Sequence, residues 1–422
     1  MSFIADLQIH SRYAQACSKQ TTLKLLEQYA RIKGIHLLGT GDFQHPEWRK
    51  EIDRELKEDE HGILWSATKF PFLWQTEISL IYTQGGKGRR VHHLLYAPNK
   101  EVATQMTEAL GRKGRLDYDG RPIFGFSSIE LVDMMRSISS DIEIIPAHAY
   151  TPWFSVFGSK SGFDSLKECF EERTKYIHAI ETGISSDPGM NWRISTLDNT
   201  QLVSFSDAHS YWPWRLGREA TIFEGDMTFK NILHAIRTGE GLGGTIEVYP
   251  SYGKYHYDGH RACNVVLSPA ETRKQQGICP VCKHPLTIGV EYRVEQLADR
   301  PVGFVPNHAK QFKSSIPLSE ILAMTLQSGI ATKKVWDLYN ALIRTFGNEF
   351  TVLFDADLTK IEQLAGSTVA KILGFSREGK LQIEPGYDGV YGKLKLDGQI
   401  LQPHDDEKLT KPAVPQKKLT DF

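Results

Sequence analysis

The chain has few cysteines and no long hydrophobic run. No stretch of about 18 apolar residues occurs, so the sequence offers no candidate for a membrane-spanning helix. The first residues, MSFIADLQIH, lack a basic segment followed by an apolar one, and we expect a strand there rather than a signal peptide. Five cysteines make a poor disulfide framework, and three of them fall within 20 residues. This clustering favours metal binding in a reducing compartment, which predicts a cytoplasmic protein.

The sequence also has no excess of charge of one sign. Its formal net charge is -1, so no global basic signal for nucleic acid is present. A neutral balance does not exclude a local basic cleft, because electrostatic attraction depends on where the charges lie. Neither GxGxxG nor GxxxxGKS occurs, and this absence disfavours a Rossmann or P-loop nucleotide site. No Ser–His–Asp or Cys–His constellation suggests covalent catalysis.

Residues 1–245 alternate short apolar runs with helical patterns. One helical pattern begins after Thr22, a candidate N-cap, and stops at Gly34. The predicted strands are 3–9, 36–40, 72–82, 91–97, 142–146, 177–181 and 202–205. Strands that alternate with helices predict an α/β domain with a largely parallel sheet, either doubly wound or closed as a barrel.

Polar residues of metal-ligand type stand at the ends of these strands. They are Asp6 and His10, Asp42 and His45, Glu77, His92 and His93, His148, Glu181, and Asp207 and His209. In a βα barrel such ends converge on one face. Imidazoles and carboxylates suit Zn²⁺, Mn²⁺ or Fe²⁺. A bridging carboxylate holds two ions about 3.5–4 Å apart, and a bound water then has a pKa near about 7, so that hydroxide can attack a phosphoester.

A structural explanation competes with this one. A single histidine at a strand end is more often a hydrogen-bonding or core residue than a ligand. Asp42 and Asp207 taken alone could be turn or cap residues. The recurrence of polar clusters after seven predicted strands favours a multinuclear metal site over seven separate caps.

The motifs ADLQIHS, GTGD, TEIS, HHLL, PAHA and SDAH, in this order, resemble the polymerase and histidinol phosphatase (PHP) family over residues 3 to 225. The resemblance implies a distorted seven-stranded (β/α)7 barrel, phosphoesterase activity and two or three divalent ions, which we expect to be Zn, Mn or Mg. Carried over by motif, the catalytic residues are Glu77, His148 and Asp207. The ligands implied are His10, Glu77 as a bridge and Asp207 for the first ion, Glu77, His93 and His148 for the second, and Asp42 and His209 for the third.

Two positions in this ligand set stay open. The first motif of this family usually reads His-x-His, and Gln8 occupies the position of the first histidine. An amide oxygen can bind a metal but carries no charge, so Gln8 is a doubtful ligand. Either His92 or His93 could serve the second ion. We favour His93 because it directly precedes two leucines.

Residues 246–300 predict a zinc-binding module. Cys279 and Cys282 form a CxxC knuckle, and His260 and Cys263 form an HxxC pair upstream. This spacing fits a tetrahedral structural Zn²⁺, whose binding contributes on the order of 10 kcal/mol to folding. His256 and His284 are alternatives to His260 as the fourth ligand.

The rest of the chain predicts a helix-rich DNA-binding domain at 301–396 and a flexible tail at 397–422. The tail ends with Gln416, Leu419 and Phe422 in a pattern similar to peptides that dock on DNA sliding clamps. Exposed apolar side chains in a tail gain nothing unless a partner buries them. Short motifs of this kind also occur by chance.

A PHP-type barrel, an HxxC–CxxC module, a helical segment and this tail, in this order, resemble the endonuclease Q family. The resemblance implies a DNA repair endonuclease that cuts single- or double-stranded DNA 5′ of uracil, hypoxanthine, xanthine or an abasic site. One alternative is a PHP-type phosphatase acting on a small molecule, which would not need about 180 residues after the barrel. Another is a catalytically weak DNA-binding scaffold, which only Gln8 supports.

Overall fold

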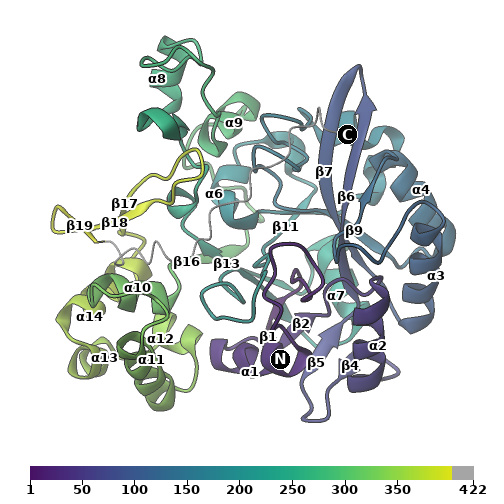
Figure 1. Ribbon diagram of the computed structural model, residues 1–422, viewed down its shortest axis with the longest axis horizontal. Helices are drawn as coiled ribbons and strands as arrows, with labels where there is room; N and C mark the ends of the chain where they lie inside the picture. The colour runs from purple at the N-terminus through teal and green to yellow at the C-terminus, as the bar shows by residue number, and fades with distance from the viewer. Residues whose placement is uncertain (402–422) are drawn as a thin grey trace.

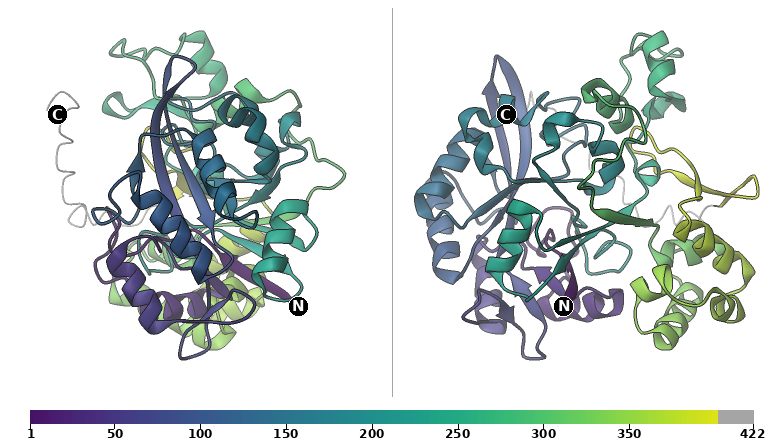
Figure 2. Two further views of the ribbon diagram at one scale, coloured as in Figure 1. Left: turned by 90° about the vertical axis from the view of Figure 1, so that its right-hand side faces the viewer. Right: turned by 180° about the vertical axis from the view of Figure 1, so that it is seen from behind.

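The computed structural model describes residues 1–401. Figure 1 shows a large α/β unit, a small module with helices α8 and α9, and a group of helices α10 to α14 at the lower left. The view from behind in Figure 2 shows the same separation of the three parts. No helix in residues 1–401 is long and apolar enough to cross a membrane.

The α/β unit is built around the predicted strands. In order they are β1 (Ser2–Asp6), β2 (Leu37–Gly39), β5 (Pro71–Leu73) with its continuation β6 (Gln75–Gln84), β7 (Lys87–Tyr96), β9 (Glu143–Pro146), β10 (Ala179–Glu181) and β11 (Gln201–Val203). β1, β2 and β5 are parallel neighbours, β6 and β7 form a long antiparallel hairpin, and β9 pairs with β7. β10 and β11 form a parallel pair.

Two irregular contacts close these strands into a barrel. Between β9 and β10, the Ala149 amide donates to the Glu181 carbonyl at 2.9 Å. Between the last and first strands, Ile9 bridges Ala208 in parallel, and the His10 amide donates to the Ala208 carbonyl at 2.9 Å. The predicted distorted barrel is therefore confirmed, and residues 10 and 208 meet at its closure.

Amphipathic helices cover the outside of the barrel, as Figure 2 shows. α1 (Leu23–Lys33) begins after Thr22, whose side chain accepts from the Leu25 amide, and ends at Gly34 with a φ of 100°. Only glycine adopts such a φ without strain, so Gly34 stops the helix as predicted. The other barrel helices are α2 (Pro46–Glu55), α3 (Lys100–Gly111), α4 (Ser128–Ile138), α5 (Leu166–Phe170), α6 (Pro188–Asn191) and α7 (Phe229–Thr238).

Further strands extend the sheet. β12 (Ala220–Glu224) pairs with β1, β13 (Leu242–Val248) pairs with β12, and β16 (Gln311–Ser315) pairs in parallel with β13. Three short strands complete the sheets: β4 (Leu64–Trp65) pairs with β5, and β3 (Lys57–Glu58) and β8 (Ile123–Phe124) lie at the edges. β16 lies within the range expected to be a separate helix-rich domain, so that range also contributes a strand to the barrel sheet.

The small module and the helical group follow. The module contains β14 (Asp258–His260), β15 (Val265–Leu267), α8 (Pro269–Lys274) and α9 (Val290–Leu297). The helices are α10 (Leu318–Thr325), α11 (Lys333–Phe346), α12 (Glu349–Phe354), α13 (Leu358–Ala365) and α14 (Ser367–Arg377), before the small sheet β17 (Gln382–Glu384), β18 (Lys393–Leu396) and β19 (Gln399–Leu401).

A buried ion pair joins the helical group to the barrel. Lys33, the last residue of α1, lies 2.8 Å from the Glu349 carboxylate, and the side chains are 1% and 0% exposed. Lys33 also donates to the Pro213 carbonyl at 2.8 Å. An aromatic cluster lies beside the pair, in which Trp212 packs on Trp214 and on Trp336 of α11. The helices are thus packed against the loop that follows the last barrel strand.

Candidate metal centre

Two groups of possible ligands converge at the carboxyl ends of the barrel strands. His10, Asp207 and His209 form the first group, with one ligand atom of each within 4.8 Å of the others. His10 Nε2 lies 3.2 Å from Asp207 Oδ1, and the rings of His10 and His209 are 4.7 Å apart. His209 turns its Nδ1 to the Asp207 carbonyl at 2.9 Å, which leaves Nε2 for a ligand.

Glu77, His92 and His148 form the second group, again within 4.8 Å of one another. His92 Nδ1 and His148 Nε2 lie 2.6 Å and 3.3 Å from Glu77 Oε1. The second nitrogen of His148, Nδ1, contacts the Ser155 hydroxyl at 3.1 Å. That contact orients the ring with Nε2 toward Glu77.

Glu77 connects the two groups. Its Oε2 lies 2.8 Å from His10 Nε2, while its Oε1 faces His92 and His148. The side chain is fully buried at the start of β6. One carboxylate thus presents one oxygen to each group, which is the arrangement of a ligand shared by two metal ions.

Asp42 lies behind His10 and outside both groups, so its predicted pairing with His209 at a third ion needs correction. Its Oδ1 contacts His10 Nδ1 at 3.0 Å, and its Oδ2 accepts from the Ser11 amide at 2.7 Å. Both oxygens are therefore engaged. A carboxylate on the far nitrogen of a ligating histidine fixes the ring and raises its basicity, so Asp42 orients His10 rather than offering itself as a ligand.

The two adjacent histidines of β7 point in opposite directions, and the preference for His93 is wrong. The His93 ring contacts the Ser128 hydroxyl at 2.9 Å and packs on Phe170, in the core beneath α4. His92 faces Glu77 instead. Successive side chains of a strand lie on opposite sides of the sheet, so only one of the two can reach the barrel mouth.

Gln8 lies within the centre. Its amide nitrogen donates to Glu77 Oε2 at 3.2 Å, and its buried Oε1 has no hydrogen-bond partner. Asp207 Oδ1 is likewise buried without a well-formed hydrogen bond, and His10 Nε2 lies 3.2 Å from it. Buried acceptors without donors are costly in a folded protein, and a cation held by the first group would satisfy Asp207 Oδ1. The donor set therefore fits divalent metal ions.

The backbone is strained at this centre. Asp42, His148 and Asp207 have φ values of 40°, 29° and 48°, in a region that residues other than glycine rarely adopt. Such strain persists only where surrounding contacts enforce it, and it concentrates at functional sites.

Charges within the centre favour the ligating forms of Glu77 and His92, whereas they favour a proton on His10 that a bound cation would displace. Burial by itself would raise the pKa of Glu77, but the nearby cationic Arg121 and the imidazoles hold it well below its usual range. Burial, together with Arg121, lowers the pKa of His92 to about 3. Burial by itself would lower the pKa of His10, but the carboxylates of Asp42, Asp207 and Glu77 raise it well above its usual range.

Arg121 was not among the predicted residues. Its guanidinium lies 3.4 Å from Glu77 Oε2 and is 25% exposed at the mouth. The loop before β8 fixes its position: the Arg121 amide donates to Asp119 at 3.0 Å, and Gln44 donates to the Gly120 carbonyl at 2.6 Å. No strand-end motif marks this loop, so sequence reasoning had no signal for it.

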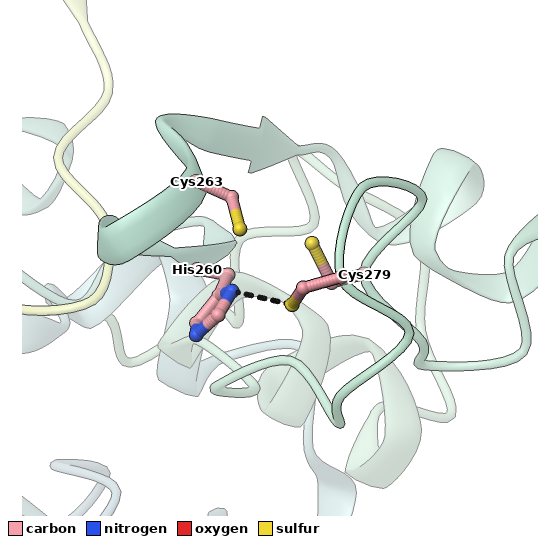
Figure 3. A group of neighbouring side chains, drawn as sticks. His260, Cys263 and Cys279 are labelled. Carbon is pink, nitrogen blue, oxygen red and sulfur yellow. Dashed lines mark hydrogen bonds between the residues drawn. The ribbon is translucent and has the colours of Figure 1, made fainter.

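A separate group lies in the small module. His260, Cys263, Cys279 and Cys282 each place one ligand atom within 4.8 Å of the others. Figure 3 shows side chains of this group turned toward a common point, with the contact of 3.2 Å between His260 Nδ1 and Cys282 Sγ dashed. His260, rather than His256 or His284, completes the group among the described residues.

The predicted clamp-binding residues Gln416, Leu419 and Phe422 lie outside the described residues.

Comparisons with known proteins cover almost the whole chain. A family model described as the MJ0043 C-terminal domain matches residues 317–380. The protein MJ0043 of Methanocaldococcus jannaschii is 32% identical over 266 residues, and the match spans 62% of this chain but only 33% of that longer protein.

Two crystal structures show the same fold. One is the lesion-specific endonuclease PfuEndoQ from Pyrococcus furiosus, with a TM-score of 0.84, 33% identity and coverage of 94% of this chain and 96% of that one. The other is endonuclease Q in complex with a 27-mer duplex that has an abasic lesion at the active site, with a TM-score of 0.84, 32% identity and coverage of 99% and 100%. With this identity over nearly the full length of both proteins, the chain belongs to the endonuclease Q family.

Proposed function

We propose that this protein is a metal-dependent endonuclease that cuts DNA at damaged nucleotides. The position of Glu77 is the main support, because one buried carboxylate directs an oxygen to each of two ligand groups at the barrel mouth. The family relatives support the substrate, since one is a lesion-specific endonuclease and the other was crystallised with damaged duplex DNA.

Two divalent ions would occupy the centre. His10, Asp207 and His209 would hold the first, His92 and His148 the second, and Glu77 both. When bound, such ions supply an activated water nucleophile and neutralise charge on the phosphate. Zn²⁺, Mn²⁺ and Mg²⁺ remain the candidates. Gln8 would join them if its amide turned its unpartnered oxygen toward the first group.

Arg121 would contact the scissile phosphate. A guanidinium has five donors, and Arg121 uses one of them, in a long contact with Glu77. Arg377, by comparison, donates to three backbone carbonyls at 2.7–2.9 Å. Cations bound to Glu77 would repel the guanidinium from that carboxylate and toward a phosphate in the mouth, where its planar fork matches phosphate oxygens.

The finer substrate assignment follows from the family resemblance. We propose cleavage 5′ of deaminated bases (uracil, hypoxanthine or xanthine) or of abasic sites. A base that pairs poorly leaves the duplex more readily, which favours damaged over intact nucleotides.

The small module would hold one structural Zn²⁺ through His260 and the three cysteines. Three thiolates and one imidazole leave no open position on a tetrahedral ion, so this metal would stabilise the fold. The five cysteines, all within the described residues, form no disulfide, which suits a reducing compartment such as the cytoplasm. A sliding clamp remains the proposed partner of the C-terminal peptide.

Glu77→Gln tests the proposal because it keeps the shape of the side chain and removes its charge. Wild-type protein supplied with Mn²⁺, Mg²⁺ or Zn²⁺ should nick a duplex with one uracil or abasic site and leave the undamaged duplex intact. Glu77→Gln should lose at least about a hundredfold in cleavage, as expected when a charged contact to the reacting centre is removed. It should also bind less metal and still bind DNA.

Glu60→Gln, on the exposed surface, is the matched control and should cut like the wild type. Wild-type activity in Glu77→Gln would contradict the metal assignment. Hydrolysis of a small phosphomonoester by the wild type, with no strand cleavage under any metal, would overturn the endonuclease proposal.

Arg121→Lys keeps the positive charge of the side chain and removes the paired, planar donors of the guanidinium. It should lower kcat by about tenfold or more with unchanged metal content, because lysine provides a point charge without the paired donors. A normal kcat in this variant would remove the phosphate role from Arg121.

A further inference from the structure

The β6–β7 hairpin carries one continuous face that runs outward from the metal centre. Residues directly opposite each other in an antiparallel pair share a face. The opposed pairs here are Ser79 with His92, Ile81 with Arg90, and Thr83 with Gly88. Glu77 lies two residues before Ser79 and therefore on the same face. The face thus begins at the metal ligands and reaches Arg90 roughly 7 Å farther along β7. Figure 1 shows this hairpin projecting from the barrel.

A groove lies beside this face. Segment 149–162 follows His148 and runs along β7, where the His92 amide donates to the Phe154 carbonyl at 3.0 Å and the Arg90 amide to the Ser161 carbonyl at 3.3 Å. Between this segment and the hairpin the groove has a volume of about 500 Å³, and its lining includes Ile81, Thr83, Arg90, Trp153, Lys160 and Ser161. It lies close to the metal centre, because Phe154, the residue after the groove-lining Trp153, packs its ring on the His92 ring at 4.7 Å.

The groove has positive charge that the protein does not neutralise. Within residues 1–401, the side chains of Arg90 and Lys160 have no ion pair or hydrogen bond; Arg90 lies 5.9 Å from the centre of the Phe154 ring. Arg89, which also borders the groove, is by contrast paired with Glu168 at 2.6 Å. The two cations are therefore available to an anion from outside.

An exposed aromatic ring lies at the same place. Trp153 is 36% exposed, and one of its neighbours is Tyr255, which it meets edge to face at 5.8 Å. The next residue, Phe154, has a φ of 61°. This sharp change of direction turns one aromatic side chain onto the metal ligand and leaves the preceding one at the groove.

We infer that this groove binds a segment of the DNA strand next to the cleavage site in single-stranded form. Arg90 and Lys160 contact its phosphates, and Trp153 stacks on one of its bases. The inference rests on the proposed function. A positively charged groove with an aromatic platform is the general arrangement for binding single strands. A ring can stack on a base face only where that base has left its neighbour, so paired DNA would gain nothing from Trp153.

Two variants test the two contacts separately. Arg90→Gln/Lys160→Ala removes both cations, and Trp153→Ala removes the ring. The matched control is Arg112→Gln/Lys175→Ala, which removes two exposed cations at α3 and near α5. The affinity of the full chain for undamaged, fluorescein-labelled single-stranded oligonucleotides is measured by anisotropy between 50 and 200 mM salt, with thermal melting as the check on folding.

The double variant should flatten the slope of log affinity against log salt by about 1.4, because each phosphate contact on a single strand contributes about 0.7. Trp153→Ala should weaken binding about tenfold with an unchanged slope, and Trp153→Phe should recover most of the loss. The control should match the wild type in both respects.

Wild-type affinity and slope in both groove variants would overturn the groove assignment. Equal losses on an undamaged duplex would overturn the single-stranded form of the bound segment. If the wild-type protein bound and cut no DNA of any kind, the proposed function itself would fail. That outcome differs from a failure of the groove assignment alone, in which the wild type still cuts DNA and the groove variants bind DNA as the wild type does.

Discussion

Replacing Glu349 by glutamine should loosen the helical group from the barrel. The Glu349 carboxylate accepts from Lys33 at 2.8 Å, from the Leu318 amide at 2.9 Å and from the Tyr339 hydroxyl at 2.6 Å. Neither Glu349 nor Lys33 is more than 1% exposed. After Glu349→Gln, the Lys33 ammonium would remain buried without an anionic partner and would face only neutral oxygens such as the Pro213 carbonyl.

The size of the effect follows from this burial. Removing one partner of a buried ion pair costs about 3–5 kcal/mol, because the other charge stays behind without compensation. Lys33→Met should cost a similar amount, since the carboxylate then keeps only its two neutral donors. The double variant Lys33→Met/Glu349→Gln leaves no buried charge, and it should lose about 2–3 kcal/mol less than the two single losses added together.

Urea unfolding followed by tryptophan fluorescence measures these losses. Trp336 of α11 packs on Trp212 of the barrel loop with ring centres 5.4 Å apart, so its emission reports the separation of the two parts. Limited proteolysis of segment 298–310 should accelerate in the single variants. The reasoning would be refuted if each single variant lost less than about 1 kcal/mol of stability and the double variant lost only the sum of the two. Removing one partner of an ion pair buried away from water leaves the other charge without compensation, which costs more than that.

Three further predictions follow from other parts of the structure. His92→Ala should reduce the number of bound ions and abolish cleavage, whereas His93→Ala should keep its metal ions and lose stability. Metal analysis of both variants checks this prediction. Loss of metal in His93→Ala but not in His92→Ala would contradict it. Cys279→Ser should release one zinc per chain and lower the melting temperature, and an unchanged zinc content would argue against the site. Burial raises the pKa of Glu219 from 4.5 to about 8 and that of Glu247 well above its usual range. As the pH rises, the unfolded chain releases these protons before the folded protein does, so stability should be greatest near pH 5 and fall toward pH 8. Melting curves should show this decline in the wild type, and the decline should be smaller in Glu247→Gln. A wild-type melting temperature that does not change over this pH range would contradict the prediction.

The barrel could be predicted because its signals are local. Each strand is a short apolar run, each intervening helix has its own periodicity, and Thr22 and Gly34 mark the ends of α1 through their own backbone chemistry. The clustering of His10, Glu77 and Asp207 followed from the rule that strand ends meet on one face.

The choice between His92 and His93 required information that a single strand does not contain. Alternation shows that the two rings diverge, but not which one faces inward. The inward side is fixed by the pairing of β7 with β6, where Ser79 stands opposite His92. Gly85 and Gly86 form the turn between β6 and β7, and a register counted back from this turn would have placed Glu77 and His92 on one face.

Asp42, Arg121 and β16 were beyond sequence reasoning for another reason. Asp42 has the residue type of a ligand, and only its distance of 3.0 Å from His10 Nδ1 reveals that it orients another ligand. Arg121 sits in a loop whose position depends on long-range contacts such as that of Gln44 with Gly120. β16 joins the barrel sheet about 60 residues after β13, a pairing that no local pattern marks.

The closure between Ile9 and Ala208 has a consequence for synthesis of the protein. His10 is among the first residues made, but the partners that complete its metal group, Asp207 and His209, come almost two hundred residues later. A nascent chain that has not yet released this later segment cannot assemble the centre. The ability to break DNA is therefore withheld until the barrel closes, and a fragment that stops before Asp207 should be harmless to the genome of the cell that makes it.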